Sequence, residues 1–341
     1  MGKVKVGIIG AGNIGRLHAN NILHSEKLEL TMIADVYTDH LKGTRFEEQV
    51  PKITKDPQEL INDKEIQLVL ICSLTNTHAE YIKAAARAGK HVFCEKPISF
   101  NIEETKEVRK IIQETGVKFQ VGFNRRFDKH FRKVYETVRT GTVGDPHIIK
   151  VTSRDPAPPP ENYIPKSGGM FMDMTIHDFD IIRYLSGSEV TEVTVNAANL
   201  VDPMFERHGD VDTAIITLQF ENGSLGVIDN SRQAVYGYDQ RIEVFGNKGA
   251  VSAENESKTN IRVATEEAVT LDVPKHFYLD RYQEAYVEEI HQLADAILED
   301  KPTSCSVEDG YQAELMAFAA NISHKEKRTV RIAELQEGSL V

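Results

Sequence analysis

The sequence predicts two domains of different class: an α/β domain with a doubly wound parallel sheet, then an α+β domain with an open, mostly antiparallel sheet and helices on one face. Three observations predict this. Up to about residue 120, short apolar runs alternate with helical patterns. A proline-rich loop, DPAPPPENYIPKSGG, then breaks the pattern. Beyond it, strand patterns follow one another with little helix between them.

The first domain is predicted to contain five strands, which are nearly continuously apolar, as is typical of parallel strands covered on both faces. They are KVGIIG, LELTMIAD, IQLVLICS, HVFCEKP and VKFQVGF. Helical patterns lie between them at residues 13–24, 57–61, 77–88 and 102–114. Alternating strands and helices indicate βαβ units, and we place this domain at residues 1–122.

The second domain is predicted at residues 123–341, with its C-terminal segment able to pack back on the first. Polar turns such as ENGS and GNKG separate some of its strands and favour antiparallel hairpins. The predicted strands are VTEVTVNAANL, VDTAIITLQF, SLGVIDNSRQA, DQRIEVFG, GAVSAEN and NIRVAT. Helices are predicted at residues 173–185, 280–299 and 308–323.

Composition narrows the possible partners and location. The 341-residue chain carries a net charge of -12, which disfavours nucleic-acid and anionic-membrane partners because both need a basic surface. No apolar run approaches the roughly 20 residues of a membrane span. The N-terminus shows no signal peptide, and the three cysteines form no disulfide or zinc pattern. We therefore expect a cytoplasmic protein with reduced thiols.

The segment GIIGAGNIG places Gly10, Gly12 and Gly15 in G-x-G-x-x-G spacing between a strand and a helix. This pattern is typical of the Rossmann dinucleotide-binding turn, where the first helical residues, here Asn13 and Ile14, face a pyrophosphate. A structural glycine turn without a nucleotide is the alternative.

The acidic residue that such a domain requires is Asp35, twenty residues after Gly15 at the end of LELTMIAD. Its carboxylate is placed to accept a hydrogen bond from a ribose 2′-hydroxyl and would repel a 2′-phosphate. Val36 and Tyr37, which follow, supply no compensating charge. The expected cofactor is therefore NAD rather than NADP.

Polar residues also follow the two next strands of the parallel sheet, at the carboxyl edge where ligands bind. The segment CSLTNTH supplies Ser73, Thr75, Asn76 and His78 as cofactor-contact candidates, with Thr77 as an alternative helix N-cap. HVFCEKPIS adds Glu95 and Lys96. A lysine beside the cofactor can stabilise a developing alkoxide, although a lysine that ends a strand is commonly only solvated.

The segment GGMFMDMTIHDFDIIRYL carries ionisable residues among large apolar ones. On a helix over 173–185, Asp173, His177, Asp180 and Tyr184 share one stripe with apolar flanks, whereas Asp178 points elsewhere and is structural or exposed. Asp173 and His177, four residues apart, can pair, so His177 is a candidate general base. The alternatives are a core histidine held by a carboxylate, or a metal site of Asp173, His177 and Asp180.

Taken together, GIIGAGNIGRLH, FCEKP and GGMFMDMTIHDFD resemble the Gfo/Idh/MocA oxidoreductases, in the same order along essentially the whole chain. QVGFNRRFD, SRDPAPPPENYI and IDNSRQAVYGYDQRIEVFG are similar, more narrowly, to bacterial inositol 2-dehydrogenases. The resemblance implies a Rossmann domain followed by an open-sheet domain, a homotetramer formed through that sheet, and NAD-dependent oxidation of a small-molecule polyol, myo-inositol, to scyllo-inosose.

The resemblance also implies site residues. Lys96, Asp173 and His177 match the family's catalytic lysine, aspartate and histidine, and all three would contact substrate. Further substrate contacts are implied at Arg125, Asp155 and Tyr238, with weaker matches at Asn124 and Arg126. No metal is expected. Other hypotheses are a dehydrogenase for scyllo-inositol or a sugar such as glucose, and a non-catalytic NAD-binding regulator.

Overall fold

The computed structural model describes residues 2–336, and its internal contacts divide the chain into two compact units. The first unit comprises the residues up to Asn124 together with Glu284–Gln312. The second comprises Arg125–Gln283 and the chain from Ala313 onward. Residues 284–312, which the sequence placed in the second domain, therefore belong to the first unit.

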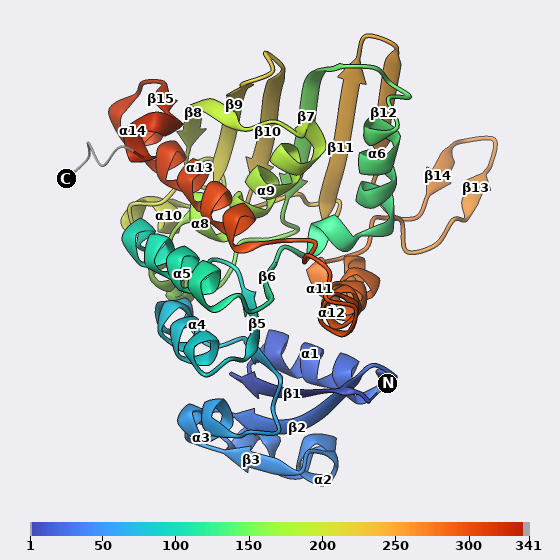
Figure 1. The fold of residues 1–341 in the computed structure, drawn as a ribbon. Coiled ribbons are helices and arrows are strands. Elements are labelled where there is room, and N and C mark those ends of the chain that lie inside the picture. Colours follow the sequence, from blue (N-terminus) through green and yellow to red (C-terminus); the bar gives the residue numbers. More distant parts are fainter. Residues whose placement is uncertain (1, 337–341) are drawn as a thin grey trace. The chain divides into compact units, whose positions relative to one another are not determined.

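The first unit is built on a six-stranded sheet of order β3-β2-β1-β4-β5-β6 in which every neighbouring pair is parallel (Figure 1). This is the strand order of the Rossmann fold, whose ligand crevice opens where the order reverses, here between β1 and β4. The strands are β1 (Val4–Ile9), β2 (Leu28–Ala34), β3 (Lys52–Thr54), β4 (Leu68–Ile71), β5 (His91–Glu95) and β6 (Phe119–Gly122).

Capping side chains and a glycine mark the ends of two helices of the first unit. Asp56 and Asn101 cap α3 and α5 by accepting hydrogen bonds from backbone N–H groups, and α5 ends at Gly116 in the left-handed conformation. The helices are α1 (Asn13–Leu23), α2 (Arg45–Gln49), α3 (Pro57–Asn62), α4 (His78–Arg87), α5 (Ile102–Thr115) and α12 (Gln283–Leu298), with 3₁₀ turns η1 (Asp39–Leu41) and η2 (Thr75–Thr77). The 3₁₀ turn η3 (Asn124–Phe127) begins at Asn124, and its other residues belong to the second unit.

Helix α12 is far from the other elements of this unit in sequence but shares their core. Its residues Ile290, Leu293 and Ala294 lie in one buried cluster with Val4 of β1 and Leu28 of β2. Burial of this apolar area is the largest stabilising contribution available to such a helix. The packing explains why residues 284–312 group with the first unit.

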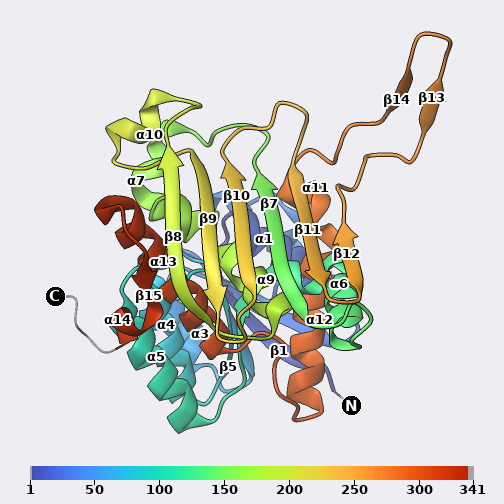
Figure 2. The same cartoon turned by 90° about the horizontal axis from the view of Figure 1, so that it is seen from above.

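The second unit is built on a seven-stranded sheet of order β12-β11-β7-β10-β9-β8-β15. Its neighbouring strands are antiparallel except for β7 and β10, which are parallel. The strands are β7 (Pro146–Arg154), β8 (Val190–Ala198), β9 (Thr213–Phe220), β10 (Leu225–Ser231), β11 (Asp239–Gly246), β12 (Gly249–Ala253) and β15 (Val330–Arg331). A hairpin of β13 (Arg262–Ala264) and β14 (Val269–Leu271) extends beyond β12 (Figure 2).

The helices of this unit that cover the sheet lie on one of its faces, behind it in Figure 2, where α9 packs on β7, and α6 packs on β11 and β12. The opposite face exposes Ile148, Ile215, Leu225 and Phe245, each of which is followed along its strand by a buried residue. The helices are α6 (Lys129–Arg139), α7 (Ile164–Ser167), α8 (Met170–Asp173), α9 (Ile176–Ser186), α10 (Pro203–Arg207), α11 (Tyr278–Arg281), α13 (Val307–Glu326, begun in the first unit) and α14 (Ile332–Gln336), with the 3₁₀ turn η4 (Glu161–Tyr163).

The prediction of one helix over residues 173–185 is wrong. The chain forms α8, then Met174 and Thr175, then α9. Two anchors account for the interruption: Asp210 accepts a hydrogen bond from the backbone N–H of Met170 at the start of α8, and the Thr175 hydroxyl donates to the buried Asn230 side chain, 2.6 Å away. Both anchors lie far from this segment in sequence, so local periodicity could not reveal them.

Candidate active site

The turn between β1 and α1 has the shape that a dinucleotide pyrophosphate requires. Gly10 has φ 95°, and a Cβ on Gly15 would lie 1.9 Å from the carbonyl oxygen of Gly10, so α1 can approach the turn only with glycine there. A Cβ on Gly12 would meet nothing within 4 Å. No side chain caps α1, whose first residues are Asn13 and Ile14, and its N–H groups are therefore available to an anion. These residues fit NAD.

Asp35 is held at the end of β2 by two backbone hydrogen bonds. The N–H of Ala11 donates to one carboxylate oxygen, 2.6 Å away, and the N–H of Tyr37 donates to the other, 2.7 Å away. Val36 and Tyr37 carry no positive charge that could attract a 2′-phosphate. They are 64% and 78% exposed, so they do not enclose this carboxylate either. The position beside the glycine turn is the one from which an acidic residue contacts the adenosine ribose.

Changing Asp35 to serine is expected to raise the affinity for NADPH relative to NADH by about tenfold or more, equivalent to about 1.4 kcal/mol, because the repulsion of a 2′-phosphate is removed. Fluorescence titration with each reduced cofactor measures the ratio. The exposed Asp39, which pairs with Lys42 in the 3₁₀ turn that follows, is the control: Asp39→Ser should leave the ratio unchanged. An unchanged ratio in Asp35→Ser would refute the ribose contact.

The loops after β4 and β5 are tied together by His78. Its Nδ1 lies 2.7 Å from the carbonyl oxygen of Pro97, its Nε2 lies 3.1 Å from that of Ser73, and the ring is buried. A neutral ring donates to only one of them, and burial lowers the pKa of His78. His78 therefore positions the backbone of both loops at the cofactor edge, and its predicted contact with the cofactor stays a prediction.

The remaining candidates of this edge lie in the same loops. The Ser73 hydroxyl is 2.7 Å from that of Thr77, and Thr75 and Asn76 form the 3₁₀ turn between them. Lys96 follows the last residue of β5 and precedes Pro97 through a cis peptide bond. The first unit thus collects the predicted cofactor residues at the carboxyl ends of β1, β2, β4 and β5.

The second unit brings together two predicted acidic residues through an arginine. One Nη of Arg232 donates to Asp173, 2.9 Å away, and the other lies 3.2 Å from Asp155. The Tyr163 hydroxyl donates to the second oxygen of Asp173, 2.8 Å away. Arg232 is 4% exposed, and each carboxylate side chain is 12% exposed. A clamp of Arg232 and Tyr163 therefore fixes the orientation of Asp173.

Asp155 titrates abnormally in this setting. Burial raises its pKa to about 6, Arg232 opposes the rise, and the nearby negative charge of Asp173 adds to it. The pKa of Tyr163 is also raised, by burial and by Asp173. Two buried carboxylates around one guanidinium form a polar site that can accept hydrogen bonds from hydroxyl groups of a ligand.

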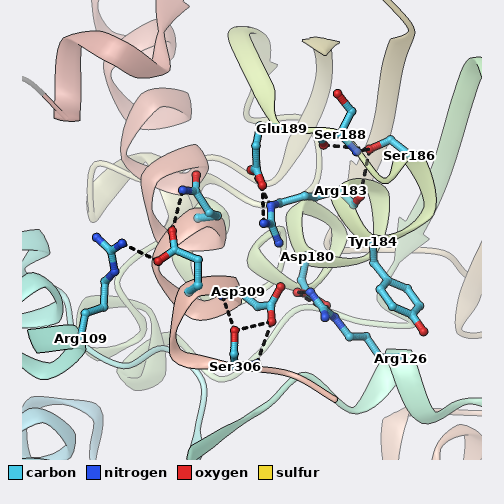
Figure 3. Close-up of polar contacts among 12 residues, drawn as sticks. Arg109, Arg126, Asp180, Arg183, Tyr184, Ser186, Ser188, Glu189, Ser306 and Asp309 are labelled. Atoms are coloured by element: carbon cyan, nitrogen blue, oxygen red, sulfur yellow. Dashed lines mark hydrogen bonds and ion pairs between the residues drawn. The ribbon is translucent and has the colours of Figure 1, made fainter. Parts of the chain in front are cut away.

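His177 is the second residue of α9, a helix whose apolar side chains are buried. Asp180 and Tyr184, predicted to share a stripe with His177, follow it by three and seven residues on the same helix, and both contact Arg126. Both oxygens of Asp180 bind Arg126, at 2.6–3.1 Å (Figure 3). Tyr184 stacks on Tyr135. Asp180 and Tyr184 therefore hold α9 against the neighbouring elements. A metal site of Asp173, His177 and Asp180 is disfavoured because each aspartate is already paired with an arginine, Asp173 with Arg232 and Asp180 with Arg126.

Arg125 and Tyr238, predicted to contact substrate, are both buried. The Arg125 guanidinium forms an ion pair with Asp178 and donates to Ser153, 3.1 Å away. Tyr238 packs edge-on against the rings of Phe277 and Tyr282. Asp178, predicted to be either structural or exposed, is therefore structural. A substrate contact of Arg125 or Tyr238 stays a prediction. Asn124 is buried in the first unit.

Sequence reasoning missed Arg232 and Tyr163. Arg232 directly follows β10 in DNSRQA, and Tyr163 lies in the proline-rich loop. The available signal was weak: an arginine near the end of the predicted strand SLGVIDNSRQA. Only the tertiary fold brings these residues to Asp173.

A parallel sheet of this order, a glycine turn shaped for pyrophosphate and an acidic residue at the end of β2 define an NAD-binding oxidoreductase domain. Comparison with known families agrees: residues 4–123 match the oxidoreductase family with an NAD-binding Rossmann fold, and residues 131–252 match the GFO/IDH/MocA C-terminal domain. The chain belongs to the Gfo/Idh/MocA oxidoreductase family.

Similar proteins span nearly the whole chain. It is 50% identical to an uncharacterised oxidoreductase of Bacillus subtilis, over 94% of each chain, and 46% identical to a myo-inositol 2-dehydrogenase of Thermotoga maritima, over 97% of this chain and 99% of the relative. The crystal structure of a Lactobacillus casei scyllo-inositol dehydrogenase with bound NAD(H) and scyllo-inositol superposes with a TM-score of 0.90, at 29% identity over 97% of this chain and all of that one.

Proposed function

We propose that this enzyme oxidises myo-inositol to scyllo-inosose with NAD⁺. The observation that carries the proposal is the clamped Asp173, held by Arg232 and Tyr163 beside Asp155 and four residues before His177. Such a site offers several fixed acceptors, as a polyol with many hydroxyls needs. The name of the Thermotoga maritima relative supports inositol as the substrate, and the Lactobacillus casei complex supports the pairing of NAD with an inositol.

In the proposed reaction each residue has one task. His177 takes the proton of the reacting hydroxyl as general base. Lys96 hydrogen-bonds that oxygen and stabilises its developing negative charge. Asp173, fixed by its clamp, orients His177, Lys96 or both, and Asp155, Arg125 and Tyr238 select which hydroxyl reacts. NAD⁺, when bound, supplies the hydride acceptor.

Initial rates of NADH formation with myo-inositol, scyllo-inositol and glucose test the proposal. We expect the highest kcat/KM with myo-inositol. A preference for scyllo-inositol would support the second candidate, which the 34% identity to a Bacillus subtilis scyllo-inositol 2-dehydrogenase favours. Binding of NADH without turnover of any polyol or sugar would instead indicate a regulator.

We further propose a homotetramer that uses the exposed sheet face, where Ile148, Ile215, Leu225 and Phe245 lie. Isolated apolar side chains are common on surfaces, but four on one face of one sheet favour an interface. We also propose a cytoplasmic location, because Cys72, Cys94 and Cys305 form no disulfide within residues 2–336. Among residues 2–336, no helix has the length and apolarity needed to cross a membrane.

A further inference from the structure

A second cluster of ionisable side chains lies within the first unit. His18 of α1, Glu95 at the end of β5 and Glu289 of α12 place one polar atom each within 4.8 Å of one another. Nε2 of His18 is 2.8 Å from Glu95 and 3.9 Å from an oxygen of Glu289. His18 and Glu289 are fully buried, whereas the Glu95 side chain is 15% exposed. None of the proposed reaction steps uses His18 or Glu289.

The surroundings of this cluster are apolar and closely fitted. The His18 ring packs edge-on against Phe93 and Tyr286. On the other side of Glu95, a Cβ on Gly122 would lie 3.0 Å from a carboxylate oxygen of Glu95, so the end of β6 leaves just enough room for that carboxylate. Glu95 is therefore held between His18 and the neighbouring strand.

Glu289 is unusual because neither of its oxygens has a hydrogen-bond partner among residues 2–336, although it is fully buried. A buried carboxylate without a partner is too costly to remain ionised. Burial and the negative charge of Glu95 raise the pKa of Glu289 well above its usual range, so the group carries a proton at neutral pH. The nearby anionic group is Glu95, with a carboxylate oxygen within 4.8 Å of Glu289, a separation that one water can bridge.

A metal ion held by the same three residues is the competing explanation. A histidine that binds a metal almost always donates its other ring N–H to an acceptor. Nδ1 of His18 is buried and has no hydrogen-bond partner in the described part of the chain. With Nε2 facing Glu95 and no partner beside Nδ1, the ring lacks the second contact that a metal-bound histidine makes, which favours a hydrogen-bonded cluster over a metal site.

We propose that His18 and protonated Glu289 are positioning residues that hold the Glu95 carboxylate and thereby fix the end of β5, where Lys96 follows, for NAD binding. Glu95 directly precedes Lys96 in the chain, so a displacement of the Glu95 carboxylate also displaces the backbone of Lys96. The inference rests on NAD binding and on the location of the cofactor edge, and it is independent of which polyol is oxidised.

Two variants of Glu289 test the proposal through NADH affinity, measured by fluorescence titration without polyol. Glu289→Gln keeps a neutral donor and should change the Kd by less than about twofold, whereas Glu289→Leu should raise it by about fivefold or more. The thermal midpoint of Glu289→Leu should change little, because leucine suits the apolar surroundings and no protein group among residues 2–336 loses a direct hydrogen bond to Glu289. Glu288→Leu is the control, since Glu288 binds Gln292 on the same helix, outside the cluster.

The pH dependence adds a readout that a purely structural role would not change. The titratable groups that face Glu289 are Glu95 from β5, His18 from α1 and Cys72, which follows β4. When Glu289 loses its proton at alkaline pH, it should repel Glu95 and weaken NADH binding. Glu289→Gln should abolish this alkaline loss, because an amide does not ionise.

Three results would overturn the proposal: an unchanged NADH Kd in Glu289→Leu, a Kd that rises only in proportion to lost thermal stability, or a stoichiometric divalent metal in the purified protein whose removal by EDTA lowers the thermal midpoint. The last result would establish the metal site instead. Because NADH binding needs no polyol, a failure of the proposed inositol dehydrogenase activity would leave the test intact.

Discussion

Replacing His177 with alanine is expected to lower kcat with myo-inositol and NAD⁺ by about 10²–10⁴-fold, the contribution of a positioned general base. NADH affinity should stay within about twofold, because the predicted cofactor contacts belong to the first unit whereas His177 belongs to the second. Steady-state rates and NADH titration measure the two effects. Retained cofactor affinity with lost turnover assigns His177 to the chemical step.

His147→Ala is the matched control for this experiment. His147 is an exposed histidine of the same unit, on β7, and its ring contacts Phe245. It should keep wild-type turnover. His177→Asn, which keeps a hydrogen-bonding side chain but cannot act as a base, should be as inactive as His177→Ala. Turnover in His177→Ala close to that of the wild type would remove His177 from the mechanism.

The fold of the first unit could be predicted because its signals are local. The four residues of β4, Leu68–Ile71, are apolar and fully buried, and Asn101 caps the helix that the sequence predicted to begin at Ile102. The glycine spacing and Asp35 lie within one βαβ unit, so a few dozen residues contain the cofactor signature. No element was predicted over helix α6, Lys129–Arg139, although Asp128 caps it by accepting hydrogen bonds from the backbone N–H groups of His130 and Phe131.

The candidate site could be predicted only in part, because its hydrogen bonds are formed between distant segments. Arg232 and Asp173 are 59 residues apart in sequence, and Arg125 and Asp178 are 53 apart. The helical wheel placed Asp180 beside His177, but an arginine from another element decides where that carboxylate points. The residue types indicated which groups are reactive, whereas identifying the partners of these groups required the tertiary fold.

Replacing Arg232 with methionine is expected to abolish measurable turnover and to lower the free energy of unfolding by about 3–5 kcal/mol, since two buried carboxylates lose their shared counter-charge. Asp173 would keep the Tyr163 hydrogen bond but lose the guanidinium, and Asp155 would lose its recorded ion pair. Arg232→Lys should recover part of the stability but little of the activity, because an ammonium cannot hold both carboxylates with a planar fork. Urea unfolding and steady-state rates measure both effects.

The stability deficit of Arg232→Met should also depend on pH. In the wild type, the pKa of Asp155 is about 6, above its ordinary value, so the folded state binds more protons than the unfolded state and this group contributes less stability as pH rises toward 6. Without Arg232 the pKa of Asp155 rises further, which extends this loss to higher pH. The free energy of unfolding of Arg232→Met should therefore lie further below that of the wild type at about pH 8 than at about pH 5.

Arg183→Met separates this effect from the loss of an arginine in general. Arg183 forms an ion pair with Glu189 in the same unit, with Nε 2.7 Å from the carboxylate (Figure 3). The Glu189 side chain is 42% exposed, so breaking this pair should cost only about 0–1 kcal/mol and leave turnover unchanged. If Arg232→Met were as active as Arg183→Met, the clamp on Asp173 would have no part in catalysis. An equal stability deficit in Arg232→Met at both pH values would mean that Asp155 does not titrate against Arg232.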